Sequence, residues 1–219
     1  EFLGMHGSVY ANYSIQSADL IIALGSRFDD RTTGNIEKYA PKAFQAAKKN
    51  KGGIIHINID NNEFDKILNS HININADCKD FFKKIIPMLE NKYDRTDWLN
   101  TISYWKKKYP WMYKKSNNNV TQDVIIELNK QLHKLNKKFL ITSDVGNHQM
   151  ITAQYIKFNH PKQFISSGSL GAMGSSISYA IGSSLANSDK LIVSIVGDGG
   201  FEMSLNDLKS INRYNLNNI

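Results

Sequence analysis

The sequence is poor in cysteine and proline and has no long hydrophobic run. The single cysteine, Cys78, excludes a disulfide scaffold and a zinc cluster built on cysteine ligands. No stretch of 18 apolar residues occurs, so we expect no membrane-spanning helix. With 14 glycines and 4 prolines in 219 residues, the chain is neither collagen-like nor of low complexity. Because 41% of the residues are hydrophobic, the chain can bury one large core or two small ones.

Arginine is also scarce, although the formal net charge is +7. There are 4 arginines against 23 lysines, together with 24 asparagines, which indicates a compositional bias. Arginine is the residue that makes bidentate contacts with bases and phosphates, and it is lysine that is abundant here. We therefore expect neither a nucleic-acid partner nor a membrane. A lysine-driven nucleic-acid binder stays open as a rival, and salt-dependent retention on DNA would support it.

Short apolar runs alternate with amphipathic segments, which is typical of parallel α/β sheets. The predicted strands cover residues 20–24, 54–59, 72–74, 139–144, 163–166 and 191–196. The predicted helices cover residues 36–49, 81–89, 98–115, 124–135, 148–155, 175–185 and 203–211. We predict an α/β protein with two Rossmann-like parallel-sheet domains joined by a helical connector. The first domain spans residues 1–92, the connector 93–118 and the second domain 119–219.

Three glycine-containing segments follow strands in the second half. Residues 197–200 read Gly-Asp-Gly-Gly, in which glycines allow a diphosphate to approach and the carboxylate suits Mg²⁺. Residues 167–176 contain three glycines before a helix, and residues 144–150 include a histidine. Taken singly, these segments also fit an ordinary turn, tight packing and a structural histidine. No serine or cysteine lies in a recognised nucleophile context, which argues against a hydrolase.

Polar residues follow the strands of the first half as well. They lie at residues 25–31, 60–62 and 76–78, where parallel strands end, which predicts a nucleotide-binding rim. We expect residues 3–7 to line the same crevice. The glycine fingerprint of ordinary dinucleotide sites is absent. The alternative for the charged residues 27–30 is a local ion pair of little energetic value.

The order and spacing of these segments resemble the acetohydroxyacid synthase (acetolactate synthase) family of thiamine-diphosphate-dependent enzymes. Residues 3–7, 18–21 and 25–31 resemble its central, flavin-side domain. Residues 144–150, 168–174 and 197–199 resemble its thiamine-diphosphate domain, and residues 44–53 resemble its fungal-type version. The resemblance covers essentially the whole chain.

This resemblance implies a carboligase-type transferase of branched-chain amino-acid biosynthesis. Such enzymes condense two molecules of pyruvate to acetolactate, or pyruvate with 2-ketobutyrate, with thiamine diphosphate, Mg²⁺ and a FAD that takes no net redox part. The partners implied are 2-ketoacid substrates, a homodimer or homotetramer of the full-length protein, and optionally a regulatory subunit. The implied location is the mitochondrion, as in fungi, with plastid and cytoplasm left open.

The resemblance also implies roles for individual residues. Asp198 would ligate Mg²⁺, and Met173 would lie against the thiazolium ring. The residues implied to bind thiamine diphosphate are Val145, Gly146, Asn147, His148, Gly171, Met173, Gly197, Gly199 and Gly200. Those implied to bind FAD are Gly4, Met5, His6, Gly25, Ser26, Arg27, Asp29, Asn58, Ile59, Asp77, Cys78, Gln149 and Met150.

Departures from the family pattern limit these expectations. Asn147, Ser169 and Ala172 replace the usual residues, and the ends of the sequence suggest a piece truncated at both ends. The second metal ligand and the glutamate that activates thiamine would lie outside it, so no catalytic residue is assigned. We predict that residues 1–219 alone lack carboligase activity. The rivals are a pyruvate oxidase or glyoxylate carboligase type of enzyme, which residues 27–31 disfavour, and a non-enzymatic nucleotide-binding module.

Overall fold

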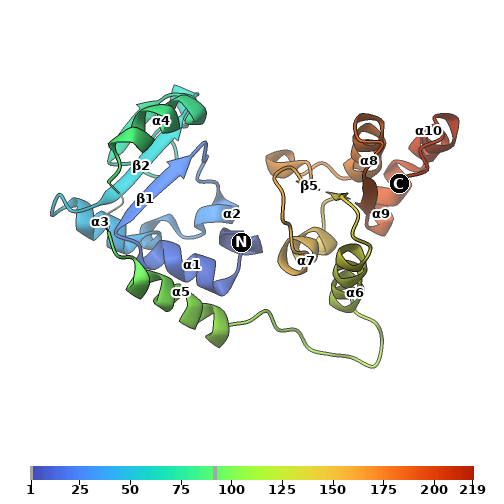
Figure 1. Ribbon diagram of the computed structural model, residues 1–219, viewed down its shortest axis with the longest axis horizontal. Helices are drawn as coiled ribbons and strands as arrows, with labels where there is room; N and C mark the ends of the chain where they lie inside the picture. The colour runs from blue at the N-terminus through green and yellow to red at the C-terminus, as the bar shows by residue number, and fades with distance from the viewer. Residues whose placement is uncertain (1, 91–92) are drawn as a thin grey trace. The chain divides into compact units, whose positions relative to one another are not determined.

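In a computed structural model, the chain divides into two compact units, residues 1–110 and 111–219 (Figure 1). The structure describes residues 2–90 and 93–219. Each unit contains a three-stranded parallel sheet with helices packed on it, so the predicted α/β fold with two parallel sheets is confirmed. The predicted domain limit at residue 92 lies outside the described residues.

The sheet of the first unit has its central strand almost completely buried. Its strands are β1 (Leu20–Leu24), β2 (Gly53–Asn58) and β3 (Ile72–Asn75), and β2 lies between the other two. Ile21 and Ala23 of β1 are buried, whereas the alternate side chains of this strand are exposed. This period of two follows from the pleat, because successive side chains point to opposite faces of a sheet.

Helices α1 (Val9–Ser17) and α3 (Pro41–Ala47) cover the buried face of this sheet. The predicted helix over 36–49 is wrong in one respect, because it is divided into the turn η2 (Ile36–Lys38) and α3. Ala40 between them has φ 49°, and Pro41 starts a new helix because its fixed φ suits a first helical position. The remaining elements are η1 (Gly4–His6), α2 (Asp30–Thr33), η3 (Asn61–Glu63), α4 (Cys78–Ile85) and η4 (Ile86–Met88).

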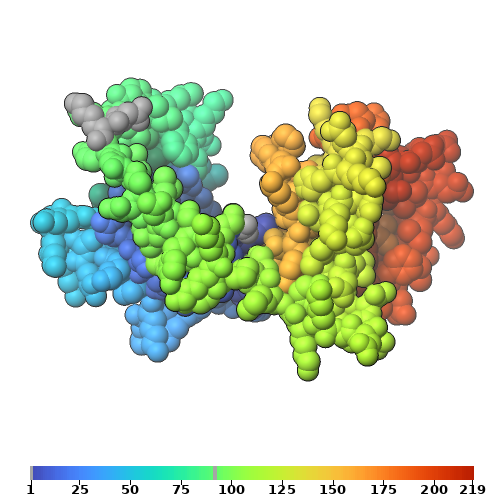
Figure 2. Space-filling view, turned by 60° about the horizontal axis from the view of Figure 1, so that its bottom comes forward, coloured from blue at the N-terminus to red at the C-terminus, as the bar shows by residue number. Residues whose placement is uncertain are grey.

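Helix α5 (Thr96–Lys108) packs on α1 within the first unit (Figure 2). The ring of Tyr13 on α1 meets the rings of Trp105 and Tyr109 edge-on, at centroid distances of 5.7 and 5.3 Å. The helix ends before the predicted residue 115, because Pro110 cannot continue it and disfavours helical backbone at the residue before it.

The aromatic residues beyond Pro110 pack within the second unit. The rings of Trp111 and Tyr113 lie 6.1 and 5.9 Å from that of Tyr155, centroid to centroid. Tyr113 also donates a hydrogen bond to Asp123, and this bond raises the pKa of Tyr113 and lowers that of Asp123. The aromatic run of the sequence therefore divides at the proline, with one part anchored in each unit.

The sheet of the second unit is covered on both faces. Its strands β4 (Phe139–Ser143), β5 (Phe164–Ile165) and β6 (Leu191–Ile195) lie in the order β5-β4-β6, and β4 is fully buried. One core forms against α6 (Thr121–Lys134) and α7 (Asn147–Tyr155). The other forms where Leu140 and Ile192 contact Ala180 of α8 (Ser175–Ala186). Strands buried on both faces explain the continuous apolar runs of the sequence.

The end of the chain differs from the predicted helix over 203–211. Helix α9 (Asp198–Met203) begins inside the glycine segment, and Ser204 separates it from η6 (Leu205–Asp207) and α10 (Leu208–Arg213). A further turn, η5 (Gly168–Leu170), precedes α8. Across residues 2–90 and 93–219, every helix is too short or too polar to cross a bilayer.

Candidate functional site

Three segments meet where β4 and β6 end, and we call them together the second-sheet edge: residues 144–148, 171–174 and 197–200. Their glycines allow contacts that side chains would block. A β-carbon placed on Gly197 would lie 3.0 Å from Cε1 of His148, and one on Gly146 only 2.8 Å from the same atom. A β-carbon on Gly199 would lie 3.5 Å from Cε of Met173. The three segments that the sequence separates by up to 50 residues are thus neighbours in space.

Asp144 is the residue that links these segments. It is fully buried, and its backbone N–H donates to the carbonyl of Ile195, at 3.0 Å, which extends the pairing of β4 with β6. Its carboxylate accepts hydrogen bonds from the N–H groups of Val145, at 2.8 Å, and of Gly174, at 2.8 and 3.0 Å to its two oxygens. A sequence signal existed, since Asp144 opens the 144–150 segment, but no role was predicted for it.

Asp198 is the first residue of α9 and is exposed. Its Oδ1 accepts a hydrogen bond from the N–H of Gly199 at 2.9 Å, which fixes the carboxylate at the strand end. Among residues 2–90 and 93–219, no three His, Cys, Asp or Glu side chains gather in a metal-ligating group. Asp198 offers one exposed carboxylate, a ligand type that Mg²⁺ accepts together with phosphate oxygens and water.

The chemistry of the second-sheet edge fits a diphosphate cofactor with an aromatic ring. The ring of His148 lies between Gly146 and Gly197, and its buried Nε2 has no hydrogen-bond partner among the described residues. Met173 is 50% exposed beside Gly199, which leaves an apolar thioether open to a ligand. A β-carbon on Gly171, at φ 59°, would touch nothing within 4 Å. The open position at Gly171, the unpaired Nε2 of His148 and the exposed thioether of Met173 therefore all belong to the second-sheet edge.

The strand ends of the first unit form a second polar edge, which we call the first-sheet edge: residues 25–29, 58–60 and 75–78. The carbonyl of Ser26 lies 2.7 Å from Nε2 of His56 and accepts from the side-chain amide of Asn58 at 3.3 Å. The amide of Asn75 donates in turn to the carbonyls of Asn58 and Ile59, at 3.1 and 3.0 Å. The ends of β1, β2 and β3 are therefore tied together by side chains that belong to β2 and β3.

His56 is a residue that the sequence analysis missed. It is fully buried on β2, and the rings of Phe28 and Phe64 pack edge-on against its imidazole, with centroids 5.1 and 5.0 Å away. A histidine in the middle of the largely apolar run 54–59 was the available signal. Asp77 and Cys78 lie at the start of α4, where the Asp77 carboxylate accepts a hydrogen bond from the N–H of Lys79 at 2.7 Å.

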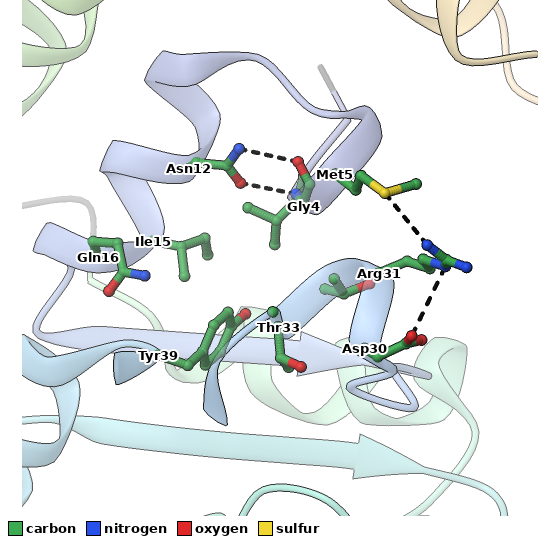
Figure 3. Close-up of a pocket in the computed structure, with 12 residues that line it drawn as sticks. Gly4, Met5, Asn12, Ile15, Gln16, Asp30, Arg31, Thr33 and Tyr39 are labelled. Carbon is green, nitrogen blue, oxygen red and sulfur yellow. Dashed lines mark hydrogen bonds and ion pairs between the residues drawn. The ribbon is translucent and has the colours of Figure 1, made fainter. Parts of the chain in front are cut away.

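A cavity of about 360 Å³ lies between η1, α1 and α2 (Figure 3). Gly4 is held by a pair of hydrogen bonds with the side-chain amide of Asn12, at 2.8 and 3.0 Å. Arg31 reaches Sδ of Met5 at 3.4 Å and Asp30 at 3.8 Å, as Figure 3 shows. Asn12 and Arg31 were not among the predicted site residues, although Arg31 belongs to the segment that was singled out.

Residues of the segment 25–33 shift the pKa values of the titratable groups beside this cavity. Burial lowers the pKa of His6, and the positive charge of Arg31 lowers it further. The negative charge of Asp29 raises the pKa by less than these two effects lower it. Burial alone would raise the pKa of Asp29, but hydrogen bonds from Thr32 and Arg27 outweigh it and lower the pKa. His6 is therefore mainly neutral, and Asp29 ionised, at neutral pH. On the wall of the cavity, burial raises the pKa of Tyr39 to about 12.

The predicted flavin residues divide between the two units. Gln149 and Met150 lie on α7 of the second unit, whereas the others belong to the first unit. Within the first unit, Gly4 and Met5 line the cavity. Asp29, which forms an ion pair of 3.2 Å with Arg27, also accepts a hydrogen bond from the N–H of Thr32 in the cavity wall at 3.0 Å. The predicted flavin residues of the first unit thus fall at two places, the cavity and the first-sheet edge.

Known protein families match both units. Residues 1–85 match the family described as "Thiamine pyrophosphate enzyme, central domain". Residues 144–219 match "Thiamine pyrophosphate enzyme, C-terminal TPP binding domain". The chain belongs to the thiamine pyrophosphate enzymes. The second match begins at Asp144 and therefore contains the whole second-sheet edge.

Among these enzymes, the chain is similar to acetolactate synthases over nearly all of its length. It is 39% identical over 213 residues to "Acetolactate synthase catalytic subunit, mitochondrial" of Saccharomyces cerevisiae, covering 96% of this chain and 31% of that protein. It is 39% identical over 218 residues to "Acetolactate synthase large subunit" of Buchnera aphidicola subsp. Acyrthosiphon pisum, covering 98% and 36%. It is 38% identical over 219 residues to "Acetolactate synthase, chloroplastic" of Arabidopsis thaliana, covering 98% and 31%. The chain thus spans about a third of the length of these relatives, and the predicted resemblance is confirmed.

Proposed function

We propose that this thiamine pyrophosphate enzyme is part of an acetolactate synthase catalytic polypeptide, a carboligase that condenses two 2-ketoacids. The substrates are two molecules of pyruvate, or pyruvate and 2-ketobutyrate, and the product enters branched-chain amino-acid biosynthesis. The observation that supports this most is the meeting of three glycine-containing segments at the second-sheet edge, beside an exposed Met173 and carboxylate Asp198. The relatives named acetolactate synthase support the choice of reaction.

The second-sheet edge would hold thiamine diphosphate and Mg²⁺. When bound, this cofactor supplies an electron sink for the carbon–carbon bond changes at a 2-ketoacid. Gly197, Gly199 and Gly200 would offer backbone to the diphosphate without intervening side chains, and the carboxylate of Asp198 would be a ligand of the metal. The residues proposed to complete this site are Val145, Gly146, Asn147, His148, Gly171 and Met173.

Met173 and His148 would orient the cofactor. The thioether of Met173 offers a polarizable apolar surface to an aromatic ring and excludes water from one side of it. The unpaired Nε2 of His148 can exchange a hydrogen bond with a polar group of the ligand, which would remove the cost of leaving that atom buried and unpaired. Both residues thus act by orientation, and no proton transfer is assigned to either.

The first unit would hold the flavin. Its proposed contacts in this unit are Gly4, Met5, His6, Gly25, Ser26, Arg27, Asp29, Asn58, Ile59, Asp77 and Cys78, while Gln149 and Met150 remain predictions from the family resemblance. Hydrogen bonds to the carbonyl of Ser26 keep the strand ends in place, and Arg27 supplies a positive charge suited to a phosphate. A neutral His6 adds no charge to this region. FAD would serve a structural role in this reaction.

The domain limits and assembly follow the same proposal. The flavin-side domain spans residues 1–92, a connector spans 93–118, and the thiamine-diphosphate domain spans 119–219; the division between the compact units falls within that connector. The full-length protein would be a homodimer or homotetramer that also accepts a regulatory subunit. A mitochondrial location is proposed because the fungal relatives carry that name, although the plant relatives are chloroplastic.

An assay of the full-length protein tests this function. Pyruvate is supplied with thiamine diphosphate, Mg²⁺ and FAD, and acetolactate is measured after conversion to acetoin. The Asp198→Asn variant should lose most of the activity, because an amide binds Mg²⁺ more weakly than a carboxylate. The matched control is Asp189→Asn, an exposed carboxylate of the same unit, which should keep it. Hydrogen peroxide in place of acetolactate, or turnover of glyoxylate when it is supplied in place of pyruvate, would instead support the rival thiamine enzymes.

A further inference from the structure

We infer that Asp144 is the positioning residue that sets the spacing of the three segments of the second-sheet edge, and so the affinity for thiamine diphosphate. This inference rests on the proposed function. Asp144 has 0% of its surface exposed, and its two carboxylate oxygens accept three hydrogen-bond contacts from two backbone N–H groups. A group so enclosed does not reach a substrate, and it acts through the backbone that it holds.

The contact with Gly174 fixes the middle segment. Both carboxylate oxygens of Asp144 accept a hydrogen bond from the backbone N–H of Gly174. Gly174 has φ 80°, a backbone conformation that suits glycine. Gly174 is also the residue before helix α8, whose positive end favours a nearby negative charge. Because Met173 directly precedes Gly174, holding this N–H also holds the exposed thioether beside Gly199.

The contact with Gly200 fixes the third segment, because the Asp144 carboxylate occupies the place where a side chain at residue 200 would lie. A β-carbon on Gly200 would lie 2.2 Å from Oδ2 of Asp144 and 2.8 Å from its Cγ, so the carboxylate rests directly against the glycine backbone. Gly200 is buried in the first turn of α9, and Asp198 opens that turn. The position of the Asp144 carboxylate therefore limits how closely the start of α9 can approach the other two segments.

Within residues 2–90 and 93–219, the carboxylate of Asp144 has no cationic partner. None of the ion pairs among the described residues involves Asp144, so the backbone N–H groups of Val145 and Gly174 provide its stabilisation. Buried carboxylates are costly unless their oxygens are hydrogen-bonded. An asparagine of the same shape has only one acceptor oxygen, so one of these contacts would be replaced by an unfavourable meeting of two donors. The position thus requires a carboxylate.

Binding of thiamine diphosphate to full-length variants tests the inference. Thiamine diphosphate is titrated with Mg²⁺ present and followed by calorimetry. The Asp144→Asn variant should bind about ten-fold more weakly, since a lost hydrogen bond to a charged group has that order of effect. Its flavin content should stay near that of the wild type, whereas its unfolding temperature should fall because a buried donor loses its acceptor. Amide hydrogen exchange without cofactor should become faster at residues 171–176 and 198–201 but not across the unit. Asp189→Asn is the control for loss of a carboxylate.

A second variant keeps the test sharp if Asp144→Asn folds poorly. Gly200→Ala leaves the carboxylate in place but adds the methyl group that would clash with it, and it should weaken binding similarly. Combined with Asp144→Ala, which makes room, its effect should be much less than additive, because the two residues are in contact. Unchanged binding in Asp144→Asn, additive effects, or loss of flavin and global stability together would overturn the inference. Failure of the wild type itself to bind thiamine diphosphate would contradict the proposed function as well.

Discussion

The two sheets end in polar edges that are held together in opposite ways. At the first-sheet edge, side chains donate to backbone carbonyls: His56 and Asn58 share the carbonyl of Ser26. At the second-sheet edge, a side chain accepts from backbone N–H groups: Asp144 binds those of Val145 and Gly174. Side-chain donors and a buried carboxylate thus perform the same task. The difference teaches that strand ends need polar anchors of either kind, and that the surrounding backbone decides which kind fits.

Removal of a central core side chain from each sheet should have the largest effect on stability. Ile54 in β2 and Ile141 in β4 are both fully buried, so Ile54→Ala and Ile141→Ala should each lower the free energy of unfolding by about 2–5 kcal/mol. Urea unfolding of the full-length protein measures this loss. Leu135→Ala, at an exposed position, is the matched control. Losses of unfolding free energy for Ile54→Ala and Ile141→Ala as small as that for Leu135→Ala would contradict the burial of the two isoleucines in the cores of the two sheets.

Breaking the anchor of the first-sheet edge should affect flavin and spare thiamine diphosphate. His56→Leu removes a donor to the carbonyl of Ser26, which should cost about 1–3 kcal/mol of stability and lower the affinity for FAD. His56→Gln retains a donor and should recover part of both. FAD fluorescence after release from purified protein gives the flavin content. An equal loss of both cofactors would contradict the separation of the two edges.

The exposed thioether should matter for the second-sheet edge alone. Met173→Ala removes apolar contact with the proposed thiamine ring and should weaken thiamine diphosphate binding by about 1–2 kcal/mol. The unfolding temperature without cofactor should change little, because Met173 is half-exposed. Leu170→Ala, at 84% exposure in the same loop, provides the control. Equal weakening by the two substitutions would count against a specific contact of Met173.

The smallest expected effect concerns pH. The pKa of His6 lies below its ordinary value of about 6.5 in the folded state, so protonation favours the unfolded chain. The stability that comes from burying neutral His6 is therefore complete above that ordinary value and is lost as pH falls through the lower folded pKa. In an NMR titration, Arg31→Gln should raise the pKa of His6 only partly, because burial is the larger cause. As the pH falls from 7 to 5, the free energy of unfolding of His6→Gln should decrease less than that of the wild type.

Much of the fold was predictable from local patterns. The apolar runs at 20–24 and 191–196 are strands because an uninterrupted apolar segment of that length, followed by glycine, suits a strand buried in a parallel sheet. The errors lie at helix ends. Pro41 and Pro110 begin or stop helices where amphipathic periodicity alone continued them, and α9 starts at Asp198 because Gly197 adopts an extended cap.

The candidate site was predictable only as a set of segments. Glycines and polar residues after strands marked residues 25–31 and 197–200, because parallel strands place their carboxyl ends at one edge. The partners of those residues were not readable. His56 and Asp144 act through contacts with residues 30 positions away in the sequence, such as Ser26 and Gly174.

The sequence by itself determined the alternation of strands and helices, the positions of the glycine-containing turns and the family resemblance. These depend on side-chain period, on backbone freedom and on the spacing of residue types, all of which are local. The tertiary structure alone decided that Asp144 is buried between two glycines, that His56 clamps a carbonyl, and that the aromatic run divides at Pro110. Such contacts depend on which distant backbone groups folding brings within hydrogen-bond distance, and no local pattern encodes that distance.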